Sequence, residues 1–186
     1  MKKHATQIPG VYLLEPQVFG DSRGWFYESF NEKTFRDLGL NTTFVQDNES
    51  FSSYGVVRGL HFQKGYFAQA KLVRVLNGHV LDVAVDIRAG SPTFGRHVVV
   101  ELSGENKLQL FIPRGFAHGF AVLSETAHFA YECDNFYAPS NEGSINALDP
   151  TLAIDWQIPK DLCKFSSKDL TAPSWDKYCK APCFTF

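Results

Sequence analysis

The chain lacks the features that mark several common protein classes. No segment reaches the roughly 18 consecutive apolar residues that a membrane-spanning helix needs, and no continuous apolar stretch follows the basic residues Lys2 and Lys3 to form a secretory signal. Charges nearly balance, with 18 Lys and Arg against 20 Asp and Glu, which disfavours a protein that coats nucleic acid. We therefore expect a cytoplasmic protein with neither a membrane segment nor a nucleic-acid partner.

Several site motifs are also missing. The four cysteines, Cys133, Cys163, Cys179 and Cys183, form no C-x-x-C pair, so neither a zinc knuckle nor a redox centre is predicted. In a reducing compartment we expect four free thiols, with a disulfide between Cys179 and Cys183 as the alternative. The sequence contains no P-loop, no strand-linked G-x-G-x-x-G and no G-x-S-x-G turn. Nucleotide binding through a glycine-rich loop and serine nucleophile chemistry are therefore not predicted.

Aromatic residues, by contrast, are abundant, at 15% of the chain with 17 Phe, and they suit the pleated surface of a β-sheet. About ten short apolar or alternating runs lie between residues 11 and 133, and turn signals separate them. The pair Asn77-Gly78 predicts a type I′ hairpin between two of these runs. A helix is predicted at residues 31–38, with Asn31 as its cap, and a shorter helical turn near residues 166–169.

This pattern predicts an all-β fold, either an antiparallel barrel or a two-sheet sandwich, with a few short helices. The length of 186 residues fits one domain spanning the whole chain, residues 1–186, in which residues 174–186 form a C-terminal tail of unassigned role.

Alternation along the predicted strands sorts side chains between the two faces of a sheet. In residues 126–133, Tyr131 shares the apolar face and is predicted to point inward. In residues 116–122, His118 shares a face with three apolar residues, and Lys71 shares one with Val73 and Val75. Strict alternation in residues 56–63 puts Arg58 and His61 on opposite faces, and polarity does not decide which is inside.

Six polar side chains thus interrupt apolar strands: Arg58, His61, Lys71, Asp82, His118 and Tyr131. Taken alone, each of these side chains is explained as a polar group, buried or at the rim of the fold, whose hydrogen bonds are satisfied. In a barrel that holds one small ligand, inward polar groups from different strands converge on one cavity. Lysine, histidine and tyrosine in such a cavity suit proton transfer, and Arg23 and Arg58 suit a diphosphate.

A metal site is not predicted. Metal-binding small barrels carry H-x-H after an early glycine turn and a later histidine after P-x-G-x-x. The later half is present at residues 113–118, but residues 78–86 contain no H-x-H. One imidazole with a distant carboxylate does not complete a coordination sphere, so His118 is interpreted as a substrate contact or a structural histidine.

A set of motifs resembles the dTDP-4-dehydrorhamnose 3,5-epimerase family, in order from about residue 7 to residue 173. The motifs are VFGDSRG (18–24), FVQDN (44–48), VRGLHFQ (57–63), QAKLVR (69–74), DVAVDIR (82–88), SPTFG (91–95), IPRGFAHGF (112–120) and SSKD (166–169).

The resemblance implies a cupin-type antiparallel β-barrel (jelly roll), a homodimer and no cofactor. The family converts dTDP-4-dehydro-6-deoxy-D-glucose to dTDP-4-dehydro-L-rhamnose by inverting C3 and C5, in the biosynthesis of dTDP-L-rhamnose for surface polysaccharide. By motif, His61 would be the base, Asp169 would orient it, and Tyr131 would be the acid on the opposite face. Lys71 would hold the charge that develops on O4.

The resemblance also implies a substrate-binding set, in which the N-terminal strand region of one subunit completes the neighbour's site. Arg23 and Arg58 would bind the diphosphate, and two aromatic residues would sandwich the thymine. The set comprises Arg23, Phe26, Glu28, Gln46, Asp47, Asn48, Arg58, His118, Phe136, Glu142 and Lys168, with Phe26 and Phe136 as the aromatic pair.

Three positions depart from the family pattern: Phe136 replaces a usual Tyr, Arg114 a usual Glu and Ala147 a usual Trp. None of them is one of the four predicted catalytic residues. The alternatives to the 3,5-epimerase are an enzyme that inverts only C3 or C5 of a related 4-keto sugar nucleotide, a non-catalytic sugar-binding cupin, and a metal-dependent cupin.

Overall fold

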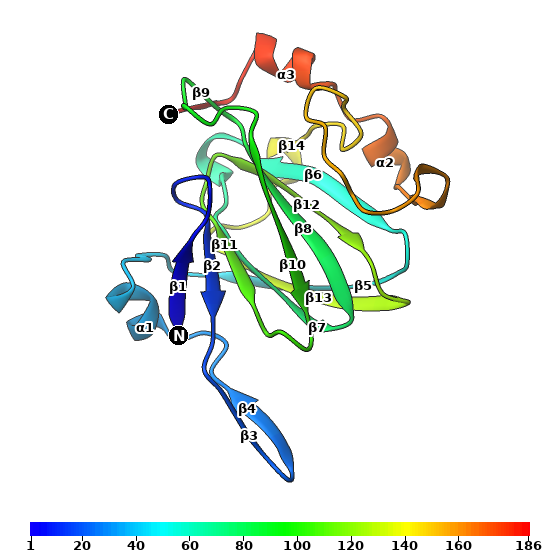
Figure 1. The fold of residues 1–186 in the computed structure, drawn as a ribbon. Helices are drawn as coiled ribbons and strands as arrows, with labels where there is room; N and C mark the ends of the chain where they lie inside the picture. Colours follow the sequence, from blue (N-terminus) through cyan, green and yellow to red (C-terminus); the bar gives the residue numbers. More distant parts are fainter.

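The computed structural model describes residues 1–186 as two facing antiparallel sheets with a few short helices at the periphery (Figure 1). The six-stranded sheet has the order β1 (Lys2–Ala5), β2 (Tyr12–Glu15), β11 (Gln109–Ile112), β7 (Lys71–Asn77), β13 (Thr126–Cys133) and β5 (Gln46–Ser53). The five-stranded sheet has the order β10 (His97–Ser103), β8 (His79–Asp86), β12 (Phe116–Val122), β6 (Val57–Gln63) and β14 (Glu142–Ser144). The predicted jelly-roll class is confirmed, as two sheets and not as a closed barrel.

The remaining elements are short. Strands β3 (Val18–Asp21) and β4 (Gly24–Tyr27) form a separate hairpin, and β9 (Arg88–Ala89) pairs in parallel with β15 (Phe184–Thr185). The helices are α1 (Glu32–Asp37), α2 (Ser167–Leu170) and α3 (Trp175–Lys180), with 3₁₀ turns at Gly65–Phe67, Pro139–Asn141 and Lys160–Leu162. No helix is long and apolar enough to cross a membrane.

Side chains from both sheets fill the space between them. One cluster of 15 buried hydrophobic residues includes Val73, Val75 and Phe129 from the six-stranded sheet and Phe116 and Phe120 from the five-stranded sheet. The rings of Phe120 and Phe129 stack across the gap with centroids 4.2 Å apart. Fully burying one such side chain contributes about 1.5–3 kcal/mol. The predicted inward face of β13 is confirmed, and the faces of β7 and β12 that carry Val73 and Phe120 also point into this space.

The outer face of the five-stranded sheet is covered by the C-terminal part of the chain. Here 16 buried residues form a second core, in which Leu60 and Phe62 of β6 join Trp156, Trp175 and Tyr178. The Trp175 amide donates to Asp149 Oδ2 at 2.8 Å, and the Tyr178 hydroxyl donates to the Ile87 carbonyl at 2.7 Å. Residues 174–186 therefore pack against the sheet that carries part of the site.

The two predicted helix starts are confirmed. The Asn31 side chain caps α1 by accepting from the Thr34 amide, and Phe35 of α1 packs on the outer face of the six-stranded sheet. The Ser166 side chain caps α2 by accepting from the Asp169 amide. Both caps satisfy a backbone donor that has no partner within its helix.

The hairpin predicted at Asn77-Gly78 is wrong. Gly78 does turn the chain, with φ at +86°, and a Cβ there would lie 2.1 Å from the Thr126 carbonyl oxygen. However, β7 pairs with β11 and β13, whereas β8 pairs with β10 and β12. The two residues therefore connect one sheet to the other. A type I′ signal reports the local turn and not the partners of the strands on either side.

The β3–β4 hairpin projects away from the two sheets as an arm (Figure 1). Phe19, Trp25 and Phe26 on this arm are 55%, 59% and 69% exposed. Three large apolar side chains grouped on a two-stranded hairpin are unusual for a surface that only water contacts.

Candidate active site

A bulge in β6 brings Arg58 and His61 to the same side of their strand. His118 of β12 pairs with His61, but Phe120 pairs with Arg58, so β6 contains one extra residue between these pairs. Gly59 occupies this position with φ at +133°, and a Cβ there would lie 2.6 Å from Gly119 Cα. Strict alternation, which put Arg58 and His61 on opposite faces, is therefore corrected by the bulge.

The His61 imidazole is held by the start of helix α2. His61 Nε2 lies 2.6 Å from Oδ1 of Asp169, which is only 4% exposed. The Ser166 hydroxyl donates to Asp169 Oδ2 at 2.8 Å, and the Ser166 hydroxyl oxygen accepts from the Asp169 amide at 3.1 Å. The helix cap thus fixes the carboxylate, and the carboxylate fixes the ring. Ser166 is a site residue that the prediction missed, although the S-x-x-D capping pattern indicated it.

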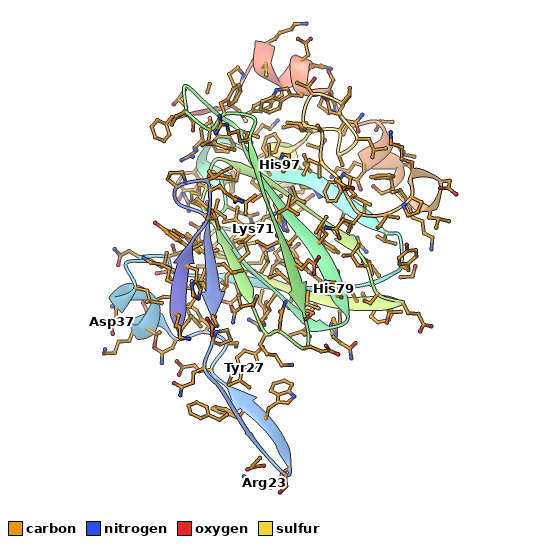
Figure 2. The ribbon with its side chains drawn as sticks, viewed as in Figure 1. Arg23, Tyr27, Asp37, Lys71, His79 and His97 are labelled. Atoms are coloured by element: carbon orange, nitrogen blue, oxygen red, sulfur yellow. The ribbon has the colours of Figure 1, made fainter.

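A cavity of about 110 Å³ opens beside His61, and Lys71 and Tyr131 line it from the opposite sheet. The Lys71 ammonium lies 5.5 Å from the centroid of the Tyr131 ring. Figure 2 shows Lys71 within the body of the molecule, far from Arg23 at the tip of the arm. The other lining residues are Gln46, Phe62, Gln63, Gln69, Cys133, Tyr137 and Glu142.

A second hollow of about 290 Å³ lies on the other side of His61 and is lined by Arg58, Lys168 and Asp169. His61 lines both spaces, so the imidazole lies between the chamber that contains Lys71 and Tyr131 and a hollow lined by three cationic side chains, Arg58, Lys164 and Lys168. A larger hollow of about 710 Å³, near the link between β7 and β8, contains none of the predicted catalytic residues. The predicted catalytic residues therefore line the two smaller spaces on either side of His61.

The electrostatic environment shifts the pKa values of three side chains that line the cavity. Burial lowers the pKa of His61, although hydrogen bonding to Asp169 opposes this shift. Burial likewise lowers the pKa of Lys71 and raises the pKa of Tyr131. At neutral pH the imidazole is neutral and can accept a proton, and the phenol retains its proton and can donate it.

Alternation along β5 places its three predicted binding residues on two different faces of the strand. Gln46 and Asn48 lie on the inner face, opposite Cys133 and Tyr131, and the Gln46 amide donates to Asn48 Oδ1 at 3.0 Å. Asp47 lies on the other face of β5, exposed and opposite Glu132. The Asp47 side chain therefore does not line the cavity of its own subunit, and its contact with the substrate stays a prediction.

An aromatic residue does line the cavity after β13, but it is Tyr137. The Tyr137 hydroxyl donates to Glu142 Oε2 at 2.9 Å, and its amide donates to Gln46 Oε1 at 2.9 Å. Phe136 is 61% exposed and lies outside the cavity lining. Tyr137 is thus the aromatic residue that lines the cavity of this chain, and the stacking role of Phe136 stays a prediction. The prediction of Glu142 and Lys168 as neighbours of the site is consistent with the ion pair that they form beside His61.

Three predicted binding residues lie on or next to the arm, away from the cavity of their own subunit. Arg23 pairs with Asp21 at 2.6 Å at the exposed tip of the hairpin, and Glu28 accepts a hydrogen bond from Asn31. Phe26 is largely exposed. The structure therefore does not bring Arg23, Phe26 and Glu28 together with His61 within one chain.

His118 lies deeper than the cavity wall, at 6% exposure, and its Nε2 atom is 2.9 Å from Asp82 Oδ2. No three His, Cys, Asp or Glu side chains come close enough together to hold a metal ion.

The four cysteines are unpaired in the structure.

Comparisons with known proteins point in one direction. The family model for dTDP-4-dehydrorhamnose 3,5-epimerase matches residues 5–177. The enzyme of that name from Salmonella typhimurium is 57% identical over 173 residues, which cover 92% of this chain and 94% of the relative.

Two solved structures are also similar. The dTDP-4-dehydrorhamnose 3,5-epimerase of Elizabethkingia anophelis has a TM-score of 0.91 at 58% identity, covering 95% of this chain and 97% of its own. The dTDP-6-deoxy-D-glucose-3,5-epimerase of Legionella pneumophila, solved with dTDP-4-keto-L-rhamnose, has a TM-score of 0.95 at 50% identity, covering 100% and 98%. The chain belongs to the dTDP-4-dehydrorhamnose 3,5-epimerase family.

Proposed function

We propose that the chain inverts C3 and C5 of dTDP-4-dehydro-6-deoxy-D-glucose, giving dTDP-4-dehydro-L-rhamnose, through enolisation at each carbon. The observation that carries this proposal is the buried His61–Asp169 pair beside a cavity that also contains Lys71 and Tyr131. Both carbons flank the C4 ketone, so removal of either proton gives an enolate whose charge lies on O4. A neutral base, a cation and a neutral acid are the groups that such a reaction requires.

His61 is proposed as the base. A carboxylate only accepts hydrogen bonds, so Nε2 carries the hydrogen that faces Asp169, and Nδ1 keeps a free lone pair for the substrate proton. As the ring becomes charged, the Asp169 carboxylate stabilises it. The low exposure of Asp169 strengthens this interaction because little water screens it.

Lys71 and Tyr131 are proposed to act on the other parts of the substrate. The Lys71 ammonium would stabilise the negative charge on O4, which develops only during enolisation and therefore lowers the barrier. The Tyr131 phenol would return a proton to the face opposite His61. Both side chains come from the six-stranded sheet, whereas His61 comes from the five-stranded sheet. The two sheets thus present base and acid from opposite sides of the space between them.

A homodimer is proposed to complete the site. The arm exposes Phe19, Trp25 and Phe26, and it carries Arg23, which has no role in the cavity of its own chain. Arg58 and Lys168 already provide positive charge in the hollow next to His61. An arm from the second subunit would add Arg23 to this charge for a diphosphate, and Phe26 would face Tyr137 across a thymine ring.

The test is to incubate the purified protein with dTDP-4-dehydro-6-deoxy-D-glucose in D₂O and to follow the substrate by NMR. We expect deuterium at both C3 and C5 and formation of the L-rhamno product. Deuterium at one carbon only would identify a mono-epimerase. Binding without deuterium uptake at either carbon would overturn the proposal in favour of a non-catalytic sugar-binding protein.

A further inference from the structure

The two faces of the arm have different surroundings. Alternation along the β3–β4 hairpin puts Trp25 and Tyr27 on one face, with their ring centroids 5.6 Å apart. Phe19 and Phe26 are paired across the hairpin on the other face, where they are 55% and 69% exposed. The face that carries Trp25 is in contact with a lysine of the same chain, whereas the face that carries Phe26 is open.

The lysine under Trp25 is Lys107, in the loop between β10 and β11. Its Nζ atom lies 3.5 Å from the centroid of the Trp25 ring, and the same ammonium donates a hydrogen bond to the Gly104 carbonyl. Lys107 is only 9% exposed, although the preceding residues Glu105 and Asn106 are exposed. An ammonium that leaves water needs compensating interactions, and the indole ring and the carbonyl supply them.

The backbone of this loop fixes where Lys107 lies. Lys107 has a φ of +57°, in the left-handed region that residues other than glycine seldom adopt. The Asn106 side chain ties the loop on both sides, because its Oδ1 atom accepts from the Ser103 amide and from the Leu108 amide, each at 3.0 Å. Lys107 is therefore held by a fixed turn and provides a firm support for the Trp25 ring.

A second contact from the same segment fastens the arm beyond the end of β4. Gln109, the first residue of β11, is 0% exposed, and its amide donates to the Ser29 carbonyl at 2.9 Å. Ser29 lies two residues after the last residue of β4, whereas Trp25 lies within β4. Residues 107–109 thus hold the arm at two separate points, and two points fix the direction of a strand.

On the basis of the proposed homodimer, we propose that Lys107 is a positioning residue that sets the direction of the arm, so that Arg23 and the face carrying Phe26 enter the active site of the partner subunit. Lys107 acts through Trp25 and does not line the cavity of its own chain. An arm that is already held in its binding direction loses less conformational freedom when the nucleotide binds. Without this contact only a fraction of the arms point correctly, and the apparent affinity falls by that fraction.

The first variant is Lys107→Met, which removes the charge and keeps an unbranched side chain. We expect the KM for dTDP-4-dehydro-6-deoxy-D-glucose and the Kd for dTDP to rise about 3-fold to 30-fold. The kcat should stay close to that of the wild type, because the arm carries none of the proposed catalytic residues. Lys107→Arg keeps a cation over the ring and should stay within about twofold of the wild type. The control is Lys160→Met, at an exposed lysine in another loop.

The second variant, Trp25→Leu, removes the same contact from the side of the arm and leaves the loop unchanged. It should raise the KM as well, and it tests the contact even where Lys107→Met fails to fold. In the Trp25→Leu background, Lys107→Met should cause no further rise, because the two residues act through one interaction. An equal effect of Lys107→Met with and without Trp25 would overturn the proposal.

Mixed dimers show whether Lys107 acts on the other subunit. One subunit carries Lys107→Met and the other carries His61→Ala, each with its own affinity tag, and the mixed dimer is purified through both tags. The cavity that retains His61 then receives the arm of the subunit with an intact Lys107. We expect the KM to return to the wild-type value. A structural effect of Lys107 confined to its own subunit would leave the KM raised and would overturn the proposal.

A rise in KM smaller than about threefold in folded Lys107→Met would also overturn the proposal. The same mixture with Arg23→Ala in place of Lys107→Met tests the proposed function separately. If that mixture does not recover the wild-type KM, the arm does not complete the partner's site and the proposed homodimer is contradicted. If it recovers while Lys107→Met alone behaves like the wild type, only the role of Lys107 is contradicted.

Discussion

Replacing Asp169 with asparagine tests the catalytic pair with little change of shape. Asp169 Oδ1 lies 2.6 Å from His61 Nε2, and Asp169 Oδ2 accepts from the Ser166 hydroxyl. An amide retains the volume and can retain the capping contact, but it has no charge. Its NH₂ group would donate to Nε2, which moves the imidazole hydrogen to Nδ1, the atom that is proposed to receive the substrate proton.

The magnitude follows from two effects. A hydrogen bond to a charged group contributes about 1.5–3 kcal/mol, which corresponds to roughly 10-fold to 150-fold in rate. The reversed tautomer adds to this loss, and an equivalent change in a catalytic Ser-His-Asp triad costs about 10⁴-fold. We therefore expect Asp169→Asn to lower kcat for epimerisation by about 10²-fold to 10⁴-fold.

The assay measures C3 and C5 deuterium uptake together with the affinity for dTDP, because the nucleotide should bind almost normally. The exposed Asp161, next to the same C-terminal segment, provides the control variant Asp161→Asn. A loss in kcat smaller than tenfold in folded Asp169→Asn would refute the assignment of Asp169 as the residue that orients and polarises His61. An equal loss in the control would also refute it.

Three further predictions concern pH and stability. In a kcat/KM profile, which reports the free enzyme, activity should fall in acid with a midpoint below 6.5, as His61 becomes protonated, and in alkali with a midpoint below 10.5, as Lys71 loses its proton. An acid midpoint above 6.5 or an alkaline midpoint above 10.5 would contradict these assignments. The pKa of Asp86 is lowered from 3.8 to about 2 by its hydrogen bonds, so it contributes about 2 kcal/mol that is present above pH 4 and lost as pH falls through 2. In urea unfolding, the free energy of unfolding of Asp86→Asn should not show this loss on acidification. An acid dependence equal to that of the wild type would contradict the contribution assigned to Asp86. Trp175→Ala should cost about 3–5 kcal/mol in urea unfolding, against less than 0.5 kcal/mol for the exposed Leu170→Ala; similar costs would show that residues 174–186 do not stabilise the fold.

Local signals in the sequence predicted the features that depend on neighbouring residues. The caps at Asn31 and Ser166 were predictable because a side chain at each helix start bonds to a backbone amide three residues later. The inward position of Tyr131 followed from alternation along an uninterrupted strand. These features need no knowledge of which strands become neighbours.

The features that were missed depend on distant partners. The bulge at Gly59 forms against Gly119 of another strand, and no local pattern shows that one residue is extra. The turn at Gly78 was recognised, but the two sheets that it connects were not. Tyr137 lies at the cavity because its amide donates to the Gln46 side chain on β5. Nothing in the sequence distinguishes Tyr137 from the neighbouring aromatic residue Phe136 as the one that faces the cavity.

The family resemblance contributed what the residues alone left open. From composition and alternation, His61, Lys71 and Tyr131 were candidates for one polar cavity, and the structure does bring them together. The role of Asp169 depended on the motif, because it lies 108 residues from its partner and only folding brings the two into contact. For the arm, the resemblance predicted binding residues that the cavity of a single chain does not contain: Arg23 lies far from Lys71 (Figure 2), and neither Arg23 nor Phe26 lines the cavity.

The most direct test of this account is proton exchange by His61→Ala. The variant removes the proposed base and leaves Arg58, Lys168 and the arm intact. In D₂O with dTDP-4-dehydro-6-deoxy-D-glucose, we expect deuterium uptake at C3 and at C5 to disappear together, while binding of dTDP remains nearly unchanged. Persistent exchange at either carbon in the folded variant would contradict the proposal that one histidine serves as the base for both.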